Sequence, residues 1–280
     1  MAVFPGDPAN DQQNKANAHF QSTAPAWRDL YYKSDLYSLL YQERRNAVLS
    51  LVDGLGLPAA RVLEVGCGPG ITSVELAMRG HTVCAIDTVQ AMIEMTRKHA
   101  ADSHMERLIL PVMGDINGLS FADNTFDLVI VVGVTEWMAS LAQPMREIAR
   151  AVKPGGYLIV TGDNTWTLNF VLDPLRNPIA APLKRWVHEA LRRLGRGPRA
   201  HSVLRSVTQL DASIVGAGLQ MIRRTAMGFG PFTFLGWNLL SDSNGWRVHK
   251  RLQALADKDW PVLRSTGHIY LALAKKPGRN

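Results

Sequence analysis

The chain has 280 residues, of which 46% are hydrophobic and 20% are charged, and its formal net charge is +7. This composition excludes a disordered, a collagen-like and a membrane-spanning protein. The length fits one large domain with elaborations or two small ones. Two cysteines, Cys67 and Cys84, are too few for a disulfide framework, and neither belongs to a metal-ligand pair. With no signal-peptide pattern at the start, we expect a cytoplasmic protein without a metal site.

The excess positive charge is concentrated in one segment. Residues 176–205 contain eight Lys or Arg and one acid, Glu189, so the remainder is balanced. A nucleic-acid binder would spread such charge over a wider face, and no nucleic-acid partner is expected. Over 179–199 the apolar residues recur at helical spacing and the basic residues lie off that face. This pattern indicates either a lid helix packed on its own domain or a helix that contacts anionic lipid.

The remaining sequence divides into three parts. Residues 1–25, rich in Asn, Gln, Ala and Pro, are expected to form a flexible, poorly ordered lead-in. Over residues 26–57 the apolar residues recur at helical spacing, which predicts a helical flap. Gly and Pro residues mark the end of this segment. Over 58–280, short apolar runs alternate with helical stretches, which predicts βαβ units and a parallel sheet with helices on both faces. The expected strands are 61–65, 82–86, 108–113, 126–132, 157–161, 219–226 and 268–274, and the expected helices are 72–79, 89–99, 141–152 and 207–217.

Two long irregular insertions, 162–206 and 228–266, interrupt this alternation. Loops of this length inside a compact domain are usually lids or binding elements. The second insertion is rich in aromatic residues, which would form either the wall of a hydrophobic pocket or a small second core. The basic residues of the first insertion and the aromatic residues of the second together favour a small, lipophilic and acidic substrate.

A glycine-rich turn follows the first expected strand, in Val62-Leu63-Glu64-Val65-Gly66-Cys67-Gly68-Pro69-Gly70. Glycines permit positive φ and bring bare backbone close to a ligand. Asp87 ends the next expected strand, where an acid accepts hydrogen bonds from ribose hydroxyls. The dinucleotide fingerprint requires Gly or Ala at position 71, where Ile71 stands, so an NAD-dependent dehydrogenase is disfavoured.

This turn resembles instead the first motif of the class I S-adenosylmethionine-dependent methyltransferases. The later landmarks agree in order and spacing: Ala85-Ile86-Asp87, Ala91-Met92, Gly114-Asp115-Ile116, Phe126-Asp127-Leu128-Val129 and Lys153-Pro154-Gly155-Gly156-Tyr157. The resemblance implies a doubly wound, Rossmann-like α/β fold with a seven-stranded, mostly parallel sheet whose last strand is antiparallel. It also implies S-adenosylmethionine as cofactor and S-adenosylhomocysteine as product.

The resemblance places the cofactor on residues of the strand ends and of the flap. The expected cofactor-binding residues are Glu64, Gly66, Cys67, Gly68, Gly70, Asp87, Thr88, Met92, Gly114, Asp115, Ile116, Val132, Tyr31 and Arg28. Arg28 or a tyrosine of the flap would bind the methionine carboxylate. Other interpretations stay open: Asp87 as a helix cap, Asp115 as a turn former, Met92 as core, and Glu64 as a residue that orients the loop.

The implied reaction is transfer of the sulfonium methyl group to a nucleophile, for which alignment and desolvation supply most of the rate. A carboxylate acceptor needs no base, whereas a hydroxyl benefits from one. We expect O-methylation of a lipophilic, acidic small molecule, with methyl ester formation on a hydroxy fatty acid as one form. Hydroxyl, N- or C-methylation, a nucleic-acid methyltransferase and a non-catalytic partner subunit are the alternatives. The candidate catalytic residues are Glu136, His201 and His268, and the candidate pocket residues are Trp137, Trp166, Phe232 and Trp237.

Overall fold

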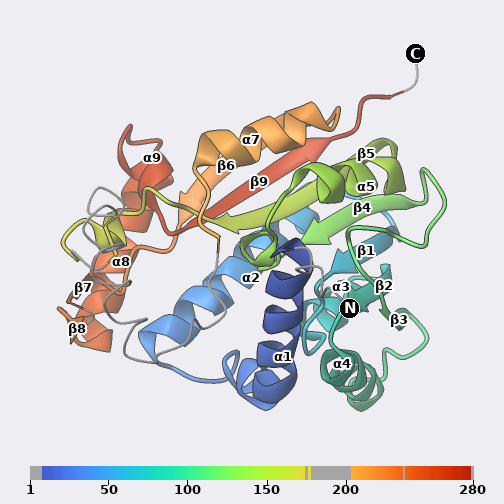
Figure 1. Ribbon diagram of the computed structural model, residues 1–280, viewed down its shortest axis with the longest axis horizontal. Coiled ribbons are helices and arrows are strands. Elements are labelled where there is room, and N and C mark those ends of the chain that lie inside the picture. The colour runs from blue at the N-terminus through green and yellow to red at the C-terminus, as the bar shows by residue number, and fades with distance from the viewer. Residues whose placement is uncertain (1–7, 174–175, 178–202, 236, 279–280) are drawn as a thin grey trace, which may run out of the picture.

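The computed structural model describes residues 8–173, 176–177, 203–235 and 237–278, and its central element is a seven-stranded sheet (Figure 1). The sheet consists of β1 (Arg61–Val65), β2 (Thr82–Asp87), β3 (Ile109–Met113), β4 (Phe126–Val131), β5 (Val152–Asp163), β6 (Gln220–Met227) and β9 (Ile269–Lys275). The strand order is β3-β2-β1-β4-β5-β9-β6, and β9 runs antiparallel to both of its neighbours. The predicted mostly parallel sheet with an antiparallel last strand is confirmed.

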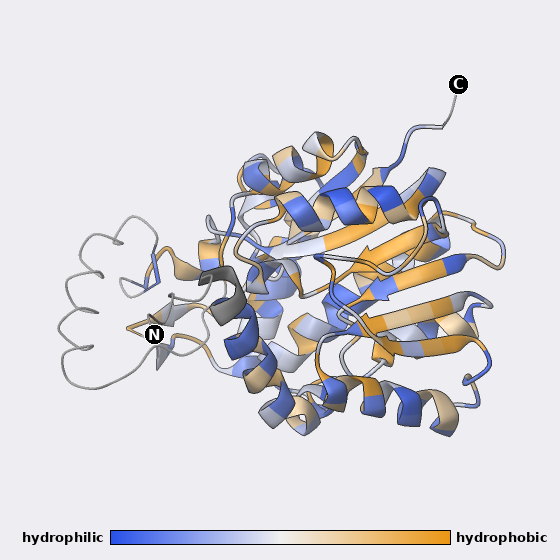
Figure 2. Ribbon diagram, turned by 45° about the vertical axis from the view of Figure 1, so that its right-hand side comes forward, coloured by the Kyte–Doolittle hydropathy of each residue, from blue (hydrophilic) through white to orange (hydrophobic). Residues whose placement is uncertain are grey.

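Helices cover both faces of this sheet (Figure 2). Strand β1 is buried on both of these faces: Leu63 and Val65 pack in the core on one side of the sheet, and Val62 packs in the core on the other. A strand buried on both faces must be apolar nearly throughout. Helices α5 (Ala142–Ala151) and α7 (Val207–Gly216) contribute to the first core; α2 (Leu36–Gly54), α3 (Ile71–Met78) and α4 (Gln90–Asp102) contribute to the second.

The amino-terminal part differs from the expectation. Residues Pro8–Asp29 form helix α1, so the lead-in predicted over 1–25 is wrong for residues 8–25. The flap expected over 26–57 contains the end of α1 and then α2, whose first turn is capped by Asp35. Helix α1 is stabilised by tertiary contact, since Phe20 and Trp27 pack near the buried Met92. Packing of this kind stabilises helices whose sequence pattern alone is weak.

A further, smaller core lies next to β6, the strand at one edge of the sheet. Phe229, Ala256 and Leu263 are its buried centre. It joins the 3₁₀ turn η2 (Leu168–Phe170), the hairpin β7 (Thr233–Phe234) and β8 (Trp237–Asn238), and helices α8 (Asp242–Ala256) and α9 (Leu263–Thr266), all at the left of Figure 1. We call residues 164–173 and 228–266 the cap. Glu43 of α2 tethers the cap by contacts with His249 and Lys250. The predicted helix over 179–199 and His201 lie outside the described residues.

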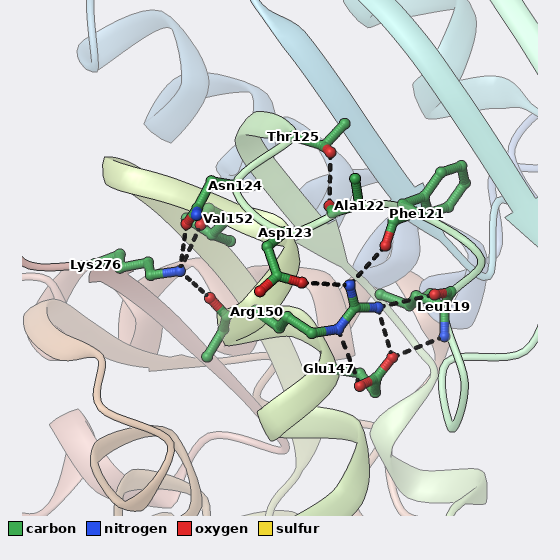
Figure 3. Close-up of polar contacts among 11 residues, drawn as sticks. Leu119, Phe121, Ala122, Asp123, Asn124, Thr125, Glu147, Arg150, Val152 and Lys276 are labelled. Atoms are coloured by element: carbon green, nitrogen blue, oxygen red, sulfur yellow. Dashed lines mark hydrogen bonds and ion pairs between the residues drawn. The ribbon is translucent and has the colours of Figure 1, made fainter.

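The amino-terminal ends of β4 and β5 are fixed by two cations (Figure 3). Arg150 donates to the carbonyl oxygens of Leu119 (2.8 Å) and Phe121 (2.6 Å). Lys276 donates to the carbonyl oxygens of Ala149 (2.6 Å) and Val152 (2.8 Å). The contacts of Arg150 order the loop before β4, at the end of the sheet opposite the carboxyl ends of the parallel strands. In the part of the chain that the structure describes, no helix is long and apolar enough to cross a membrane.

Candidate active site

A cavity of about 780 Å³ opens at the carboxyl ends of β1, β2, β4 and β5, where open parallel sheets bind ligands. Helices α1 and α2 form its cover, and η1 (Thr135–Trp137) and the start of β9 complete the wall. The volume is sufficient for a nucleoside-sized cofactor together with a small acceptor.

The glycine-rich turn forms the floor of this cavity. The backbone N–H groups of Gly66 and Cys67 both donate to the carbonyl oxygen of Ile86, at 2.8 and 3.0 Å, and fix the turn to β2. Gly66 has φ +68°, and a Cβ there would lie 2.3 Å from Cγ2 of Val134. A side chain at this position would therefore strain the backbone and also collide with the wall of the cavity.

Asp87 supports the same turn from the end of β2. Its Oδ2 accepts from the N–H of Gly68 at 3.0 Å, and its Oδ1 accepts from the N–H of Val89 at 2.9 Å. Burial raises the pKa of Asp87, against the hydrogen bonds from Val89 and Gly68. Each oxygen retains a lone pair, so Asp87 can hold the loop and also accept hydrogen bonds from ribose hydroxyls.

Glu64 lies on β1 beneath the turn and is only 4% exposed. Its Oε2 accepts a hydrogen bond from the hydroxyl of Ser73 on α3. Burial raises the pKa of Glu64 to about 8, and the charge of Asp87 also acts in this direction. Glu64 also lines the cavity, so it can orient the loop and contact a ligand.

The other expected cofactor-binding residues divide into those in the wall and those outside it. The wall includes Tyr31, Cys67, Gly68, Thr88, Met92, Gly114, Asp115, Ile116 and Val132. Gly70 lies outside it, as the N-terminal cap of α3. Arg28 also lies outside it, exposed to solvent and paired with Asp29. Asp115 accepts from the N–H of Asn117 at 2.8 Å, so it forms a turn as well.

The arginine at the cavity wall is Arg44 of α2, whereas the sequence suggested Arg28 as the partner of the methionine carboxylate. It is 5% exposed, lines the cavity, and its guanidinium lies 4.4 Å from the ring centroid of Tyr41. Its Nε has no hydrogen-bond partner among the described residues. A Cβ on Gly133 would lie 3.2 Å from both of its terminal nitrogens.

The environment keeps Arg44 charged. Burial acts to lower the pKa of Arg44, but Tyr31, Tyr41 and Glu136 raise it overall. A buried, charged guanidinium whose Nε has no partner among the described residues suits a carboxylate ligand, so Arg44 could hold the methionine carboxylate of S-adenosylmethionine. The signal in the sequence is an arginine on the buried face of α2, four residues from both Leu40 and Val48.

Three ionisable residues meet in the other half of the cavity. Glu136 follows β4, Asp163 ends β5 and His268 precedes β9, and the strand order brings them together. His268 Nε2 lies 3.9 Å from Asp163 Oδ1, and His268 Nδ1 is buried without a hydrogen-bond partner in the described part of the chain. Burial, together with the charge of Asp163, raises the pKa of Glu136 to about 8. The cluster therefore places a carboxyl group of raised pKa and an imidazole in the cavity, which are groups of the kind that act in general acid–base catalysis.

Of the four expected pocket residues, only Trp137 lines the cavity, where Phe20 of α1 packs edge-on against it at 5.0 Å. Trp166 is 54% exposed and Trp237 is 80% exposed. Phe232 packs in the core of the cap. The cavity wall instead contains Tyr37, Tyr41, Phe170, Arg176 and Leu204, which the sequence did not single out.

Comparison with known proteins agrees with this geometry. Residues 63–160 match the family described as methyltransferase domain. Ubiquinone biosynthesis O-methyltransferase of Rhizobium johnstonii is 32% identical over 187 residues, which cover 66% of this chain and 70% of that protein. Malonyl-(acyl-carrier protein) O-methyltransferase of Erwinia pyrifoliae is 38% identical over 101 residues, 36% of each chain.

The fold is also similar to that of a solved structure. Magnesium protoporphyrin IX methyltransferase from Synechocystis PCC 6803, solved with bound S-adenosylhomocysteine, superposes with a TM-score of 0.63. The two share 16% sequence identity, and the match covers 95% of this chain and 100% of that one. The chain belongs to the S-adenosylmethionine-dependent methyltransferase family and is an enzyme that uses this cofactor.

Proposed function

We propose that the enzyme methylates a hydroxyl oxygen of a small, lipophilic acceptor, and that His268 accepts the hydroxyl proton. The observation that carries this proposal is the pair of His268 and Asp163 in the wall of the cavity, 3.9 Å apart, beside the buried Glu136. A histidine next to a carboxylate is a common general base, because the carboxylate stabilises the imidazolium that forms. The name of the Rhizobium relative, an O-methyltransferase, supports the choice of oxygen.

Hydroxyl methylation fits this cluster better than the methyl ester formation considered from the sequence. A carboxylate acceptor needs no base, and next to Asp163 it would meet a like charge. An acidic group elsewhere on the acceptor still has a partner, because Arg176 lies at the cavity wall with its guanidinium 5.1 Å from the ring centroid of Phe170. An acceptor with an aromatic or lipophilic body and a distant acidic group therefore suits this wall.

Each residue has a distinct part in the proposed mechanism. Bound S-adenosylmethionine supplies an already activated methyl group. Arg44 holds the carboxylate end and Asp87 holds the ribose, which fixes the direction of transfer. Trp137 and Phe170 exclude water from the acceptor half. His268 accepts the proton, and the nearby carboxylate of Asp163 stabilises the positive charge that forms on the ring.

The test uses methyl-labelled S-adenosylmethionine, the purified enzyme and a panel of lipophilic phenols, alcohols, carboxylic acids and amines. Products are extracted into an organic phase and treated with mild alkali. Label that stays in the organic product after transfer to a hydroxyl compound supports an ether. Label released as volatile methanol means a methyl ester and contradicts the proposal, as does transfer to amines alone.

Several expectations remain part of this proposal. We retain a small-molecule acceptor and no nucleic-acid partner, a cytoplasmic location, and the division into a flap and a methyltransferase domain with lid insertions. Peripheral membrane contact through 179–199 stays a prediction, since that segment lies outside the described residues.

A further inference from the structure

A short segment near the end of the first insertion links the two strand ends that form the acceptor half of the cavity. Its first residue, Val203, donates from its N–H to the carbonyl oxygen of Glu136 at 2.6 Å. Its last residue, Arg205, donates from its N–H to the carbonyl oxygen of Asp163 at 3.1 Å. Leu204 between them lines the cavity. We call these three residues, 203–205, the strap; it joins the loop after β4 to the end of β5.

The guanidinium of Arg205 holds the loop that follows β4. It donates to the carbonyl oxygens of Thr135 at 2.7 Å, of Ala139 at 3.2 Å and of Met138. These carbonyl groups belong to η1 or directly follow it, and η1 carries Trp137 in the cavity wall. A turn this short leaves carbonyl groups without helical donors, and a planar guanidinium with five N–H groups serves several of them at once.

Arg205 lies behind the wall of the cavity. It does not line the cavity itself, whereas Leu204, Met138 and Trp137 all do. Its backbone is bonded to the end of β5 in both directions, since its carbonyl oxygen also accepts from the N–H of Thr165 at 3.0 Å. Loss of the guanidinium would leave carbonyl groups of a partly buried loop without their donors, so the loop would be free to move relative to the strap.

We propose that Arg205 is a positioning residue of the acceptor site, which holds η1 against the strap so that Trp137 and Leu204 form one wall. Leu204 is then a specificity residue that limits the size of the acceptor. This role depends on the placement of the acceptor at the ends of β4 and β5, and neither on a hydroxyl acceptor nor on His268 as the base. Misplacing such a wall by about 1 Å can lower the rate by about 10²-fold.

The test measures methyl transfer to the compound with the highest turnover in the panel of phenols, alcohols, carboxylic acids and amines, whichever class it belongs to. Arg205→Met removes the donors at nearly constant length, and Arg205→Lys keeps the charge without the planar fork. The matched control is Arg150→Met, because Arg150 also donates to two loop carbonyls, those of Leu119 and Phe121, at the opposite end of the sheet (Figure 3). Melting temperatures and calorimetric titration with S-adenosylhomocysteine are recorded for each variant.

We expect Arg205→Met to raise the KM of the acceptor about tenfold or more and to leave the affinity for S-adenosylhomocysteine unchanged. Arg205→Lys should show most of the same loss. Arg150→Met should lower the melting temperature and leave the acceptor KM unchanged, because a smaller folded fraction lowers only the apparent kcat. Leu204 is 36% exposed, so Leu204→Ala should fold normally. It should favour a homologue of the acceptor with one more alkyl group about tenfold in relative kcat/KM.

Amide hydrogen exchange of the free enzyme tests the same contact without an acceptor. The N–H groups of Trp137 and Met138 donate to the carbonyl oxygens of Val134 and Thr135, at 3.0 and 3.3 Å. Both amides should exchange faster in Arg205→Met, because the turn opens more often once its carbonyl groups lose the guanidinium. The amides of the glycine-rich turn should exchange at an unchanged rate.

The role of Arg205 would be refuted by an acceptor KM or an exchange rate that Arg205→Met leaves unchanged. Full recovery in Arg205→Lys would also overturn it, since only the positive charge near Glu136 would then matter. Unchanged selectivity in Leu204→Ala would remove Leu204 from the acceptor wall. If no compound of the panel is methylated, the proposed function fails by itself, because hydrogen exchange still decides whether Arg205 holds the turn.

Discussion

Replacing Gly66 by alanine tests how the glycine-rich turn is built. The new Cβ would sit at φ +68° and 2.3 Å from Cγ2 of Val134. The backbone strain costs about 1–2 kcal/mol, and displacing Val134 adds about 1–3 kcal/mol of overpacking. We therefore expect Gly66→Ala to lower the free energy of unfolding by about 2–5 kcal/mol. It should also weaken binding of S-adenosylhomocysteine, because Val134 lines the cavity.

Two variants separate strain from collision. Gly68 also has positive φ, +53°, but a Cβ there would meet nothing within 4 Å, so Gly68→Ala should show the strain alone. In a Val134→Ala background the colliding methyl group is absent, and Gly66→Ala should cost only about 1–2 kcal/mol. Urea unfolding and calorimetric titration with S-adenosylhomocysteine measure both quantities. If Gly66→Ala lowered the free energy of unfolding equally in both backgrounds, a collision with Val134 would not be the cause.

Three further variants test the site and the cap. Arg44→Met should weaken binding of S-adenosylmethionine about 10- to 100-fold in calorimetry, whereas Arg28→Met should leave it unchanged; the reverse pattern would contradict the assignment. The pKa of Glu64 is about 8 in the folded enzyme and ordinarily 4.5. The folded state therefore holds a proton that the unfolded state releases, so stability falls as pH rises from about 5 to just above 8. Because burial also raises the pKa of Glu136 to about 8, Glu64→Gln should remove only the part of this fall that Glu64 contributes in a pH series of melting temperatures. An unchanged slope would exclude Glu64 as a source. Asn169 is buried and makes three hydrogen bonds to the backbone of Gly228 and Gly230, so Asn169→Ala should cost about 1–3 kcal/mol in urea unfolding, and no loss would show that the cap is held otherwise.

The sheet and the glycine-rich turn could be predicted because their signals are local. Apolar runs buried on two faces identify strands, and a turn that needs positive φ restricts the sequence to glycine, as at Gly66. Asp87 follows from its place after the second strand. These signals depend on a few neighbouring residues, so the sequence carries them without knowledge of distant contacts.

The residues that the sequence misplaced depend on long-range packing. Arg28 and Arg44 both lie in helical segments near the amino terminus, and only the packing of α1 and α2 shows which one lines the cavity. The aromatic run of 228–266 fits a pocket wall or a second core, and the structure has Phe232 in the core and Trp237 in solvent. Helix α1 was missed because its stability comes from contacts with α4 and η1.

In the proposed mechanism, His268 removes the hydroxyl proton during methyl transfer. The most direct measurement compares the single-turnover rates of the unchanged enzyme and His268→Gln on two acceptors of the same shape. One is a phenol that is neutral at the assay pH, and the other is its fluorinated analogue that is already ionised. We expect a loss of about 10²–10⁴-fold on the neutral phenol and little loss on the ionised one. Equal losses on both acceptors would contradict it.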